Sequence, residues 1–177
     1  RNIWVLLGSL GKNNTYFTDE IFVNNGLKKK KKEERINIVQ FRKGQENNPI
    51  KIENLEDLLT EISVHDLNCN PSDVKFIYSG NGEFPYGARE QWTDSCNLLA
   101  IKEGVVIGYD RNDKTIEAFK AEGFEAIKAA DLCQQLEAGI KNIDTITNTF
   151  IMLPSAELSR ARGGSHCMSM PLLRDNW

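Results

Sequence analysis

Short β-type runs alternate with amphipathic helical runs along this chain, and the alternation restricts the fold more than any other feature. Residues 97–101 and 105–109 flank the turn dipeptide Glu103-Gly104, which is typical of a β-hairpin. An amphipathic helix is predicted over 113–122, and Gly123 stands where a glycine commonly ends a helix. Residues 124–127 follow as a strand. The pattern predicts an α/β (α+β) fold with mixed sheets.

The first half of the chain has a similar order of elements. After early strands in the N-terminal segment, a strand is predicted over 36–41, a helix from 55 onward, and a strand over 74–78 that ends at Gly80. Two consecutive units therefore read strand–strand–helix–strand, which is a weak indication of an internal repeat. A polar, partly helical insertion over 130–144 precedes a final strand at 149–153. For 177 residues we expect a single domain over 1–177.

The N-terminal segment allows more than one interpretation. The apolar run 3–7 follows Arg1 and could be the remnant of a signal peptide or a strand. The β-type residues at 15–17 and 21–23 favour strands, in a chain that begins inside a longer protein. Residues 28–35 contain five consecutive lysines, which could form a phosphate or nucleic-acid patch. Acidic residues follow at once, so we expect a mobile, solvated loop.

Composition argues against several classes of partner and site. With 22 Lys+Arg against 25 Asp+Glu the net charge is −3, so we expect no nucleic-acid partner. No apolar run approaches the roughly 20 residues that span a bilayer, so we expect no membrane partner. The four cysteines share no CxxC spacing and there are two histidines, which argues against a metal site. A reduced, cytoplasmic compartment is therefore the default expectation.

The segment with the densest chemical signal is 159–171, around Cys167. Gly163 and Gly164 allow the backbone to turn sharply and to approach a ligand closely. Arg160, Arg162 and His166 lie within seven positions of Cys167, and positive charges near a thiol favour its nucleophilic thiolate form. Arg162 could instead hold a substrate carboxylate in a bidentate fork. From these residues alone, a buried structural cysteine is the competing interpretation.

Three segments resemble the arginine deiminases, members of the guanidino-modifying superfamily with the pentein propeller fold. Residues 157–174 resemble the C-terminal signature of the family, and 88–94 and 104–112 also resemble it. The resemblance implies a hydrolase acting on C–N bonds of linear amidines, which converts L-arginine and water to L-citrulline and ammonia without metal or organic cofactor. Cys167 matches the nucleophile, and Arg162 matches a residue that pairs with the substrate α-carboxylate. His166 would be a loop residue that tunes the thiol.

The sequence also departs from that family. In that family the proton shuttle lies in a His-x-Asp motif, and a loose alignment places Asn2 and Trp4 of this chain at those two positions. The acidic residues that hold the guanidinium in the family are missing from this sequence. His65 is expected to be an exposed loop residue. We therefore expect an incomplete site in the C-terminal part of the catalytic domain, and either a homo-oligomer or association with the missing N-terminal half.

Other functions remain open from the sequence. One alternative is a non-catalytic or degenerate pentein-fold domain that binds guanidino compounds without hydrolysing them. Another is a related amidinotransferase, or an agmatine or dimethylarginine hydrolase, although agmatine has no carboxylate for Arg162. Glu90 and Asp94 could contact substrate, but a helix-start or loop ion pair is the simpler interpretation. Residues 80–82 are expected to form a turn and not a phosphate cradle.

Overall fold

The computed structural model describes residues 3–7 and 38–173, which fall into two compact units, Arg1–Phe76 and Ile77–Trp177. The predicted strands at 15–17 and 21–23 and the charged loop 28–35 lie outside the described residues. The prediction of one domain over 1–177 stays a prediction.

The first unit contains a small hairpin and one long helix. Strands β2 (Ile38–Gln40) and β3 (Ile50–Ile52) pair antiparallel. Helix α2 (Leu55–Leu67) begins where the side chain of Asn54 accepts a hydrogen bond from the Asp57 amide, at 2.7 Å. His65 lies in the last turn of α2 and is exposed, so the prediction that it belongs to a loop is wrong.

The apolar run near the N-terminus is a strand. β1 (Ile3–Leu7) pairs with β4 (Val74–Tyr78) in a two-stranded sheet, and the short 3-10 helix η1 (Pro71–Asp73) precedes β4. Both strands lie where the sequence predicted them.

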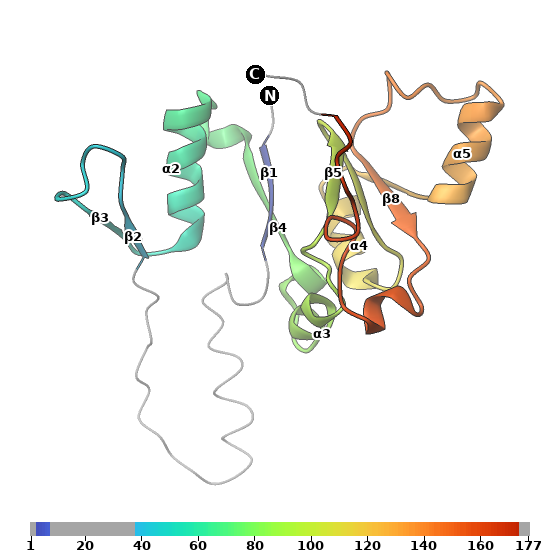
Figure 1. The fold of residues 1–177 in the computed structure, drawn as a ribbon, viewed down its shortest axis with the longest axis horizontal. Helices are drawn as coiled ribbons and strands as arrows, with labels where there is room; N and C mark the ends of the chain where they lie inside the picture. Colours follow the sequence, from blue (N-terminus) through green and yellow to red (C-terminus); the bar gives the residue numbers. More distant parts are fainter. Residues whose placement is uncertain (1–2, 8–37, 174–177) are drawn as a thin grey trace, which may run out of the picture. The chain divides into compact units, whose positions relative to one another are not determined.

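The second unit is built around a four-stranded mixed sheet in the order β5-β6-β8-β7. Figure 1 labels its strands β5 and β8 and its helices α4 and α5. β5 (Leu99–Lys102) and β6 (Val105–Tyr109) form the predicted antiparallel hairpin. β8 (Thr149–Leu153) runs parallel to both β6 and β7 (Glu125–Lys128). The predicted mixed α/β class is therefore confirmed. The order strand–strand–helix–strand is also present, but β8 lies between β6 and β7, and closure into a propeller stays a prediction.

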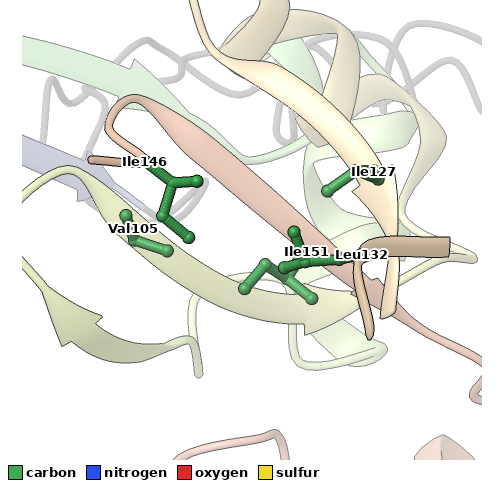
Figure 2. Packing of buried hydrophobic residues seen from close by; sticks show 5 residues of the cluster. All are labelled: Val105, Ile127, Leu132, Ile146 and Ile151. Carbon is green, nitrogen blue, oxygen red and sulfur yellow. The ribbon is translucent and has the colours of Figure 1, made fainter. Parts of the chain in front are cut away.

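Helices α4 (Asp113–Ala121) and α5 (Ala129–Glu137) cover opposite faces of this sheet. The ring of Phe119 on α4 packs against Phe150, with ring centroids 4.9 Å apart. Leu132 on α5 joins a buried cluster with Ile151 (Figure 2). Positions 150 and 151 are consecutive in β8, so their side chains point to opposite faces. The other members of the Leu132 cluster are Val105, Ile127 and Ile146.

A compact helical segment connects β4 to β5. It comprises η2 (Ser79–Gly82) and α3 (Tyr86–Trp92). Gly80 has φ +60, and a Cβ there would lie 2.3 Å from the Gly87 amide nitrogen, so 80–82 is the predicted turn and the two elements pack backbone to backbone. Within the part of the chain that is described, no helix has the length and apolar character needed to span a membrane.

Candidate functional site

Cys167 lies on a loop at the carboxyl edge of the parallel strands. β6 and β8 pair in register, with Tyr109 opposite Leu153, so the segments that follow them meet at one edge. The Asp110 amide donates to the Leu153 carbonyl at 2.9 Å, and Ser155 Oγ donates to Asp110 Oδ1 at 3.0 Å. The chain then passes through η3 (Leu158–Arg160) to residues 162–168, which we term the cysteine loop.

Two side chains fix the turn at the start of the cysteine loop. Arg162 and Gly163 have φ +61 and +128, a region that residues other than glycine adopt rarely. Tyr109 Oη donates to the Gly163 carbonyl at 2.7 Å, and the Gly163 amide donates to Asp94 Oδ2 at 3.2 Å. Both backbone polar groups of Gly163 are thus satisfied. Asp94 therefore contacts the loop through a backbone hydrogen bond and not through the ion pair that the sequence favoured.

The middle of the loop lies directly on Asn97. The His166 amide donates to the Asn97 carbonyl at 3.3 Å. A Cβ built on Gly164 would lie 2.4 Å from Asn97 Cβ and 2.5 Å from the Asn97 carbonyl oxygen. Because real side-chain atoms do not approach so closely, only glycine allows this backbone contact.

Cys167 itself is exposed, and its thiol is free. Asn97 Nδ2 donates a hydrogen bond to Cys167 Sγ. The competing interpretation of a buried structural cysteine is therefore wrong. His166, within the same loop, is also exposed and contacts Asn97 through its backbone amide.

Arg162 lies at the entrance of the same loop and stacks on an aromatic ring. Its guanidinium carbon lies 4.0 Å from the centroid of Trp92, whose side chain is 67% exposed. Such cation–π contacts contribute about 0.5–1 kcal/mol at exposed sites. No carboxylate in the described ranges forms an ion pair with Arg162.

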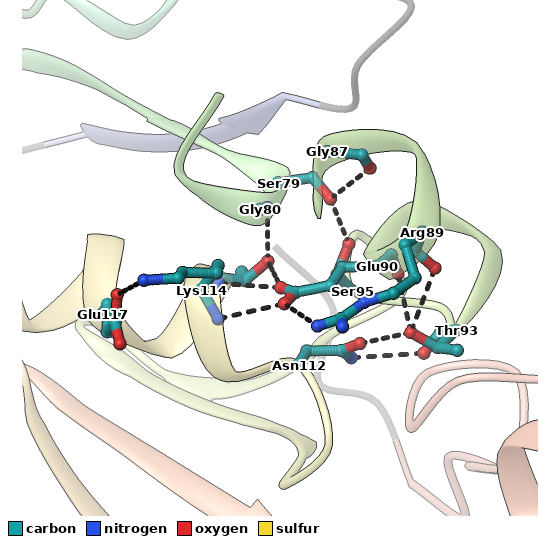
Figure 3. A network of polar contacts seen from close by, with 11 residues as sticks. Ser79, Gly80, Gly87, Arg89, Glu90, Thr93, Ser95, Asn112, Lys114 and Glu117 are labelled. Atoms are coloured by element: carbon teal, nitrogen blue, oxygen red, sulfur yellow. Dashed lines mark hydrogen bonds and ion pairs between the residues drawn. The ribbon is translucent and has the colours of Figure 1, made fainter. Parts of the chain in front are cut away.

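Glu90 in α3 is fully buried and joins α3 to the start of α4. Its carboxylate accepts from the amides of Lys114 and Thr115, at 3.0 and 2.8 Å, and from Thr115 Oγ1 at 2.7 Å (Figure 3). The free amides at the start of α4 and the helix dipole both favour a negative group there. Glu90 also pairs with Arg89 Nη2 at 3.1 Å, so the predicted ion pair at a helix start is confirmed, although the helix start is that of α4.

The surroundings of Tyr109, which holds the cysteine loop at Gly163, keep its hydroxyl protonated. Burial raises the pKa of the Tyr109 hydroxyl above its ordinary value of 10.0, and the charges of Asp94 and Cys167 raise the pKa further. Tyr109 therefore remains a hydrogen-bond donor to Gly163. Among the described residues, no group of three or more His, Cys, Asp or Glu could hold a metal ion.

The structure brings Cys167 and Arg162 onto one loop, as their spacing suggested, but it also adds Asn97 and Tyr109. Neither residue stood out in the sequence. A signal was available for Tyr109, which ends a strand of the parallel pair, the usual edge for functional groups in such sheets. Asn97 lies 70 positions from Cys167, and nothing local to it indicated the contact.

Comparisons with known proteins identify the relationship. A family model described as arginine deiminase matches residues 18–174. An arginine deiminase of Oenococcus oeni is 36% identical over 129 residues, which cover 73% of this chain and 25% of that protein. One from Borrelia garinii is 37% identical over 103 residues, covering 58% of this chain and 19% of the relative. One from Staphylococcus aureus is 36% identical over 104 residues, covering 59% and 20%.

The chain thus spans about a fifth to a quarter of the length of the curated relatives that it matches. The match to the family model covers residues 18–174, which is most of the sequence, and includes the whole cysteine loop. The chain belongs to the arginine deiminase family.

Proposed function

We propose that this chain supplies the nucleophile loop of a hydrolase that converts L-arginine and water to L-citrulline and ammonia. The observation that carries the proposal is the exposed Cys167 sulfur, which receives an N–H from Asn97 on a loop held in an unusual backbone conformation. A nucleophile must be accessible and held in one position, and both requirements are met by these contacts.

The proposed reaction has two covalent steps. The Cys167 thiolate attacks the guanidinium carbon and forms a C–S bond, and a C–N bond breaks as ammonia leaves with a proton from a general acid. Water then attacks the thiouronium carbon and gives one proton back to the same group, now acting as a base. The C–S bond breaks, the electron pair returns to sulfur, the second proton is taken up by the released ammonia, and citrulline forms. Neither step requires a metal or an organic cofactor.

Arg162 is the proposed contact for the substrate α-carboxylate. Within the described residues, no carboxylate forms an ion pair with the guanidinium of Arg162. The guanidinium carbon lies 4.0 Å from the centroid of the Trp92 ring, and this stacking restricts its orientation. A planar, bidentate donor suits a carboxylate, and anchoring the far end of the substrate positions the reacting carbon.

The general acid and the carboxylates for the guanidinium are proposed to lie outside these 177 residues. The sequence contains two histidines, His65 and His166, and neither stands in a His-x-Asp motif. This absence also favours a second candidate, a pentein-fold domain that binds guanidino compounds without hydrolysing them. The two candidate functions differ in whether Cys167 attacks the bound guanidino compound and citrulline is released.

Assembly with further chain is part of the proposal. Met170, Leu172 and Leu173 are 77–88% exposed, and such apolar residues are usually covered by other protein. We propose that they are covered in a closed pentein propeller, by the remainder of the enzyme or by a second copy, and that the enzyme is cytoplasmic.

The test is a chimera. Residues 74–173 replace the matching segment of the Oenococcus oeni arginine deiminase, and citrulline is measured for the chimera, its Cys167→Ala variant and the 177-residue chain. We expect release by the chimera, none by Cys167→Ala, and none by the chain alone. A folded chimera that binds L-arginine but releases no citrulline would reject the hydrolase and favour the binding domain. Release by the chain alone would reject the proposal that the site is incomplete.

A further inference from the structure

We propose that Asn97 is a further catalytic residue, whose side-chain amide donates to the sulfur of Cys167 throughout the reaction. The inference rests on the proposed function, because it needs Cys167 to be the nucleophile. The side-chain nitrogen of Asn97 is the hydrogen-bond partner of Cys167 Sγ. An ionised sulfur can only accept hydrogen bonds, so the donor end of the amide must face it.

Asn97 is fixed independently of this contact. Its own amide donates to the Asp94 carbonyl at 3.0 Å, and its carbonyl accepts from the His166 amide at 3.3 Å. Gly164 packs against its Cβ and Cγ, where a side chain on the loop would overlap. The backbone of Asn97 is therefore held on both sides, and its side chain is pressed against the loop that carries the sulfur.

The hydrogen bond is useful in two steps. Before attack it holds the sulfur of an exposed side chain in one position, which favours alignment with the guanidinium carbon. During hydrolysis the C–S bond breaks and the electron pair returns to sulfur. A donor already in place stabilises that charge as it develops, without reorganisation, in the manner of other preorganised donors. Asn97 exchanges no proton and forms no covalent bond.

The isosteric variant Asn97→Asp separates this role from a structural one. Aspartate keeps the shape and the backbone contacts but replaces the donor with a carboxylate oxygen. The readout is the rate of iodoacetamide alkylation at neutral pH, followed by mass spectrometry of the peptide that contains Cys167. Cys133 on α5 is exposed and serves as the reference thiol in the same sample.

We expect Asn97→Asp to slow alkylation of Cys167 by about tenfold or more, since hydrogen bonds to charged groups are the strong ones and the new carboxylate repels a thiolate. Cys133 should react at its original rate. An unchanged Cys167 rate in folded Asn97→Asp would overturn the proposal. Should that variant fail to fold, Asn97→Ser and Asn97→Ala replace it. Serine retains a hydrogen-bond donor and alanine does not, so Cys167 should be alkylated about threefold faster or more in Asn97→Ser than in Asn97→Ala. Equal alkylation rates in the two variants would overturn the proposal.

This measurement is distinct from the test of the proposed function. Alkylation reports on the sulfur alone and needs no complete active site. If the chimera releases no citrulline while Asn97→Asp slows alkylation, the hydrolase proposal fails and the hydrogen bond stands. If the chimera is active and alkylation is unchanged, the role of Asn97 alone is rejected.

Discussion

Replacing Gly164 with alanine should dislodge the cysteine loop through packing alone. The added Cβ would lie 2.4 Å from Asn97 Cβ, 2.5 Å from its carbonyl oxygen and 2.7 Å from its Cγ. Two of these atoms belong to backbone or to a Cβ, and so they cannot rotate away. The backbone at Gly164 is not in the left-handed region, so alanine adds no conformational strain there.

The magnitude follows from the overlap. Overpacking by one methyl group costs about 1–3 kcal/mol, and the rigidity of Asn97 places Gly164→Ala at about 2–3 kcal/mol. Separating the loop from Asn97 also breaks the hydrogen bond from the His166 amide. At about 1.4 kcal/mol for each factor of ten, opening of the loop should become roughly 30- to 150-fold more frequent.

Amide hydrogen exchange at His166 measures that opening directly, because its N–H bonds to the Asn97 carbonyl. We expect exchange at His166 to accelerate by at least about thirtyfold in Gly164→Ala, with exchange in β6 and β8 unchanged. Ala161→Ser, an exposed substitution beside the same loop, is the matched control and should change nothing. Unaltered His166 exchange in Gly164→Ala would refute the packing argument.

Three further substitutions test the supports of the loop. Tyr109→Phe should lower the unfolding free energy by about 1 kcal/mol at neutral pH. Because the folded pKa of Tyr109 is raised above 10.0, the hydroxyl contribution is full below that pH and is lost as pH rises through the folded value, so wild type and variant should converge in alkaline urea titrations. Glu90→Gln should cost at least about 2 kcal/mol by urea unfolding, whereas the exposed ion-pair control Glu117→Gln should cost less than about 0.5. In the chimera, Trp92→Leu should weaken L-arginine binding about two- to fivefold relative to Trp92→Phe by releasing Arg162, and calorimetry with agmatine should show no difference.

The elements were predictable where the local pattern was strong. The hairpin of β5 and β6 follows from two apolar runs around Glu103-Gly104, and Gly104 has φ +71 as such a turn requires. Gly123, with φ +87, ends α4 where the sequence placed a helix terminus. The position of β8 was not predictable, because pairing between strands depends on contacts far apart in the chain.

The residues of the site also fall into those that the local sequence predicted and those that depend on distant contacts. Cys167 and Arg162 were identified because glycines and cationic residues lie within a few positions of each other. The function of Glu90 depends on α4, which begins 23 positions later and presents its free amides to the carboxylate. Polar residues of this kind are indistinguishable from surface residues until their partner is known.

By itself, the sequence determined the mixed α/β class, most of the helices and strands, and the loop that bears the thiol, since turn chemistry and periodicity act over neighbouring residues. Only the tertiary structure decided what lies against that thiol. The parallel pairing of β6 with β8 brings Tyr109 to Gly163, and the hairpin brings Asn97 to Cys167 across 70 positions. The physical reason is that a hydrogen bond depends on distance and direction in space, which a one-dimensional pattern does not contain.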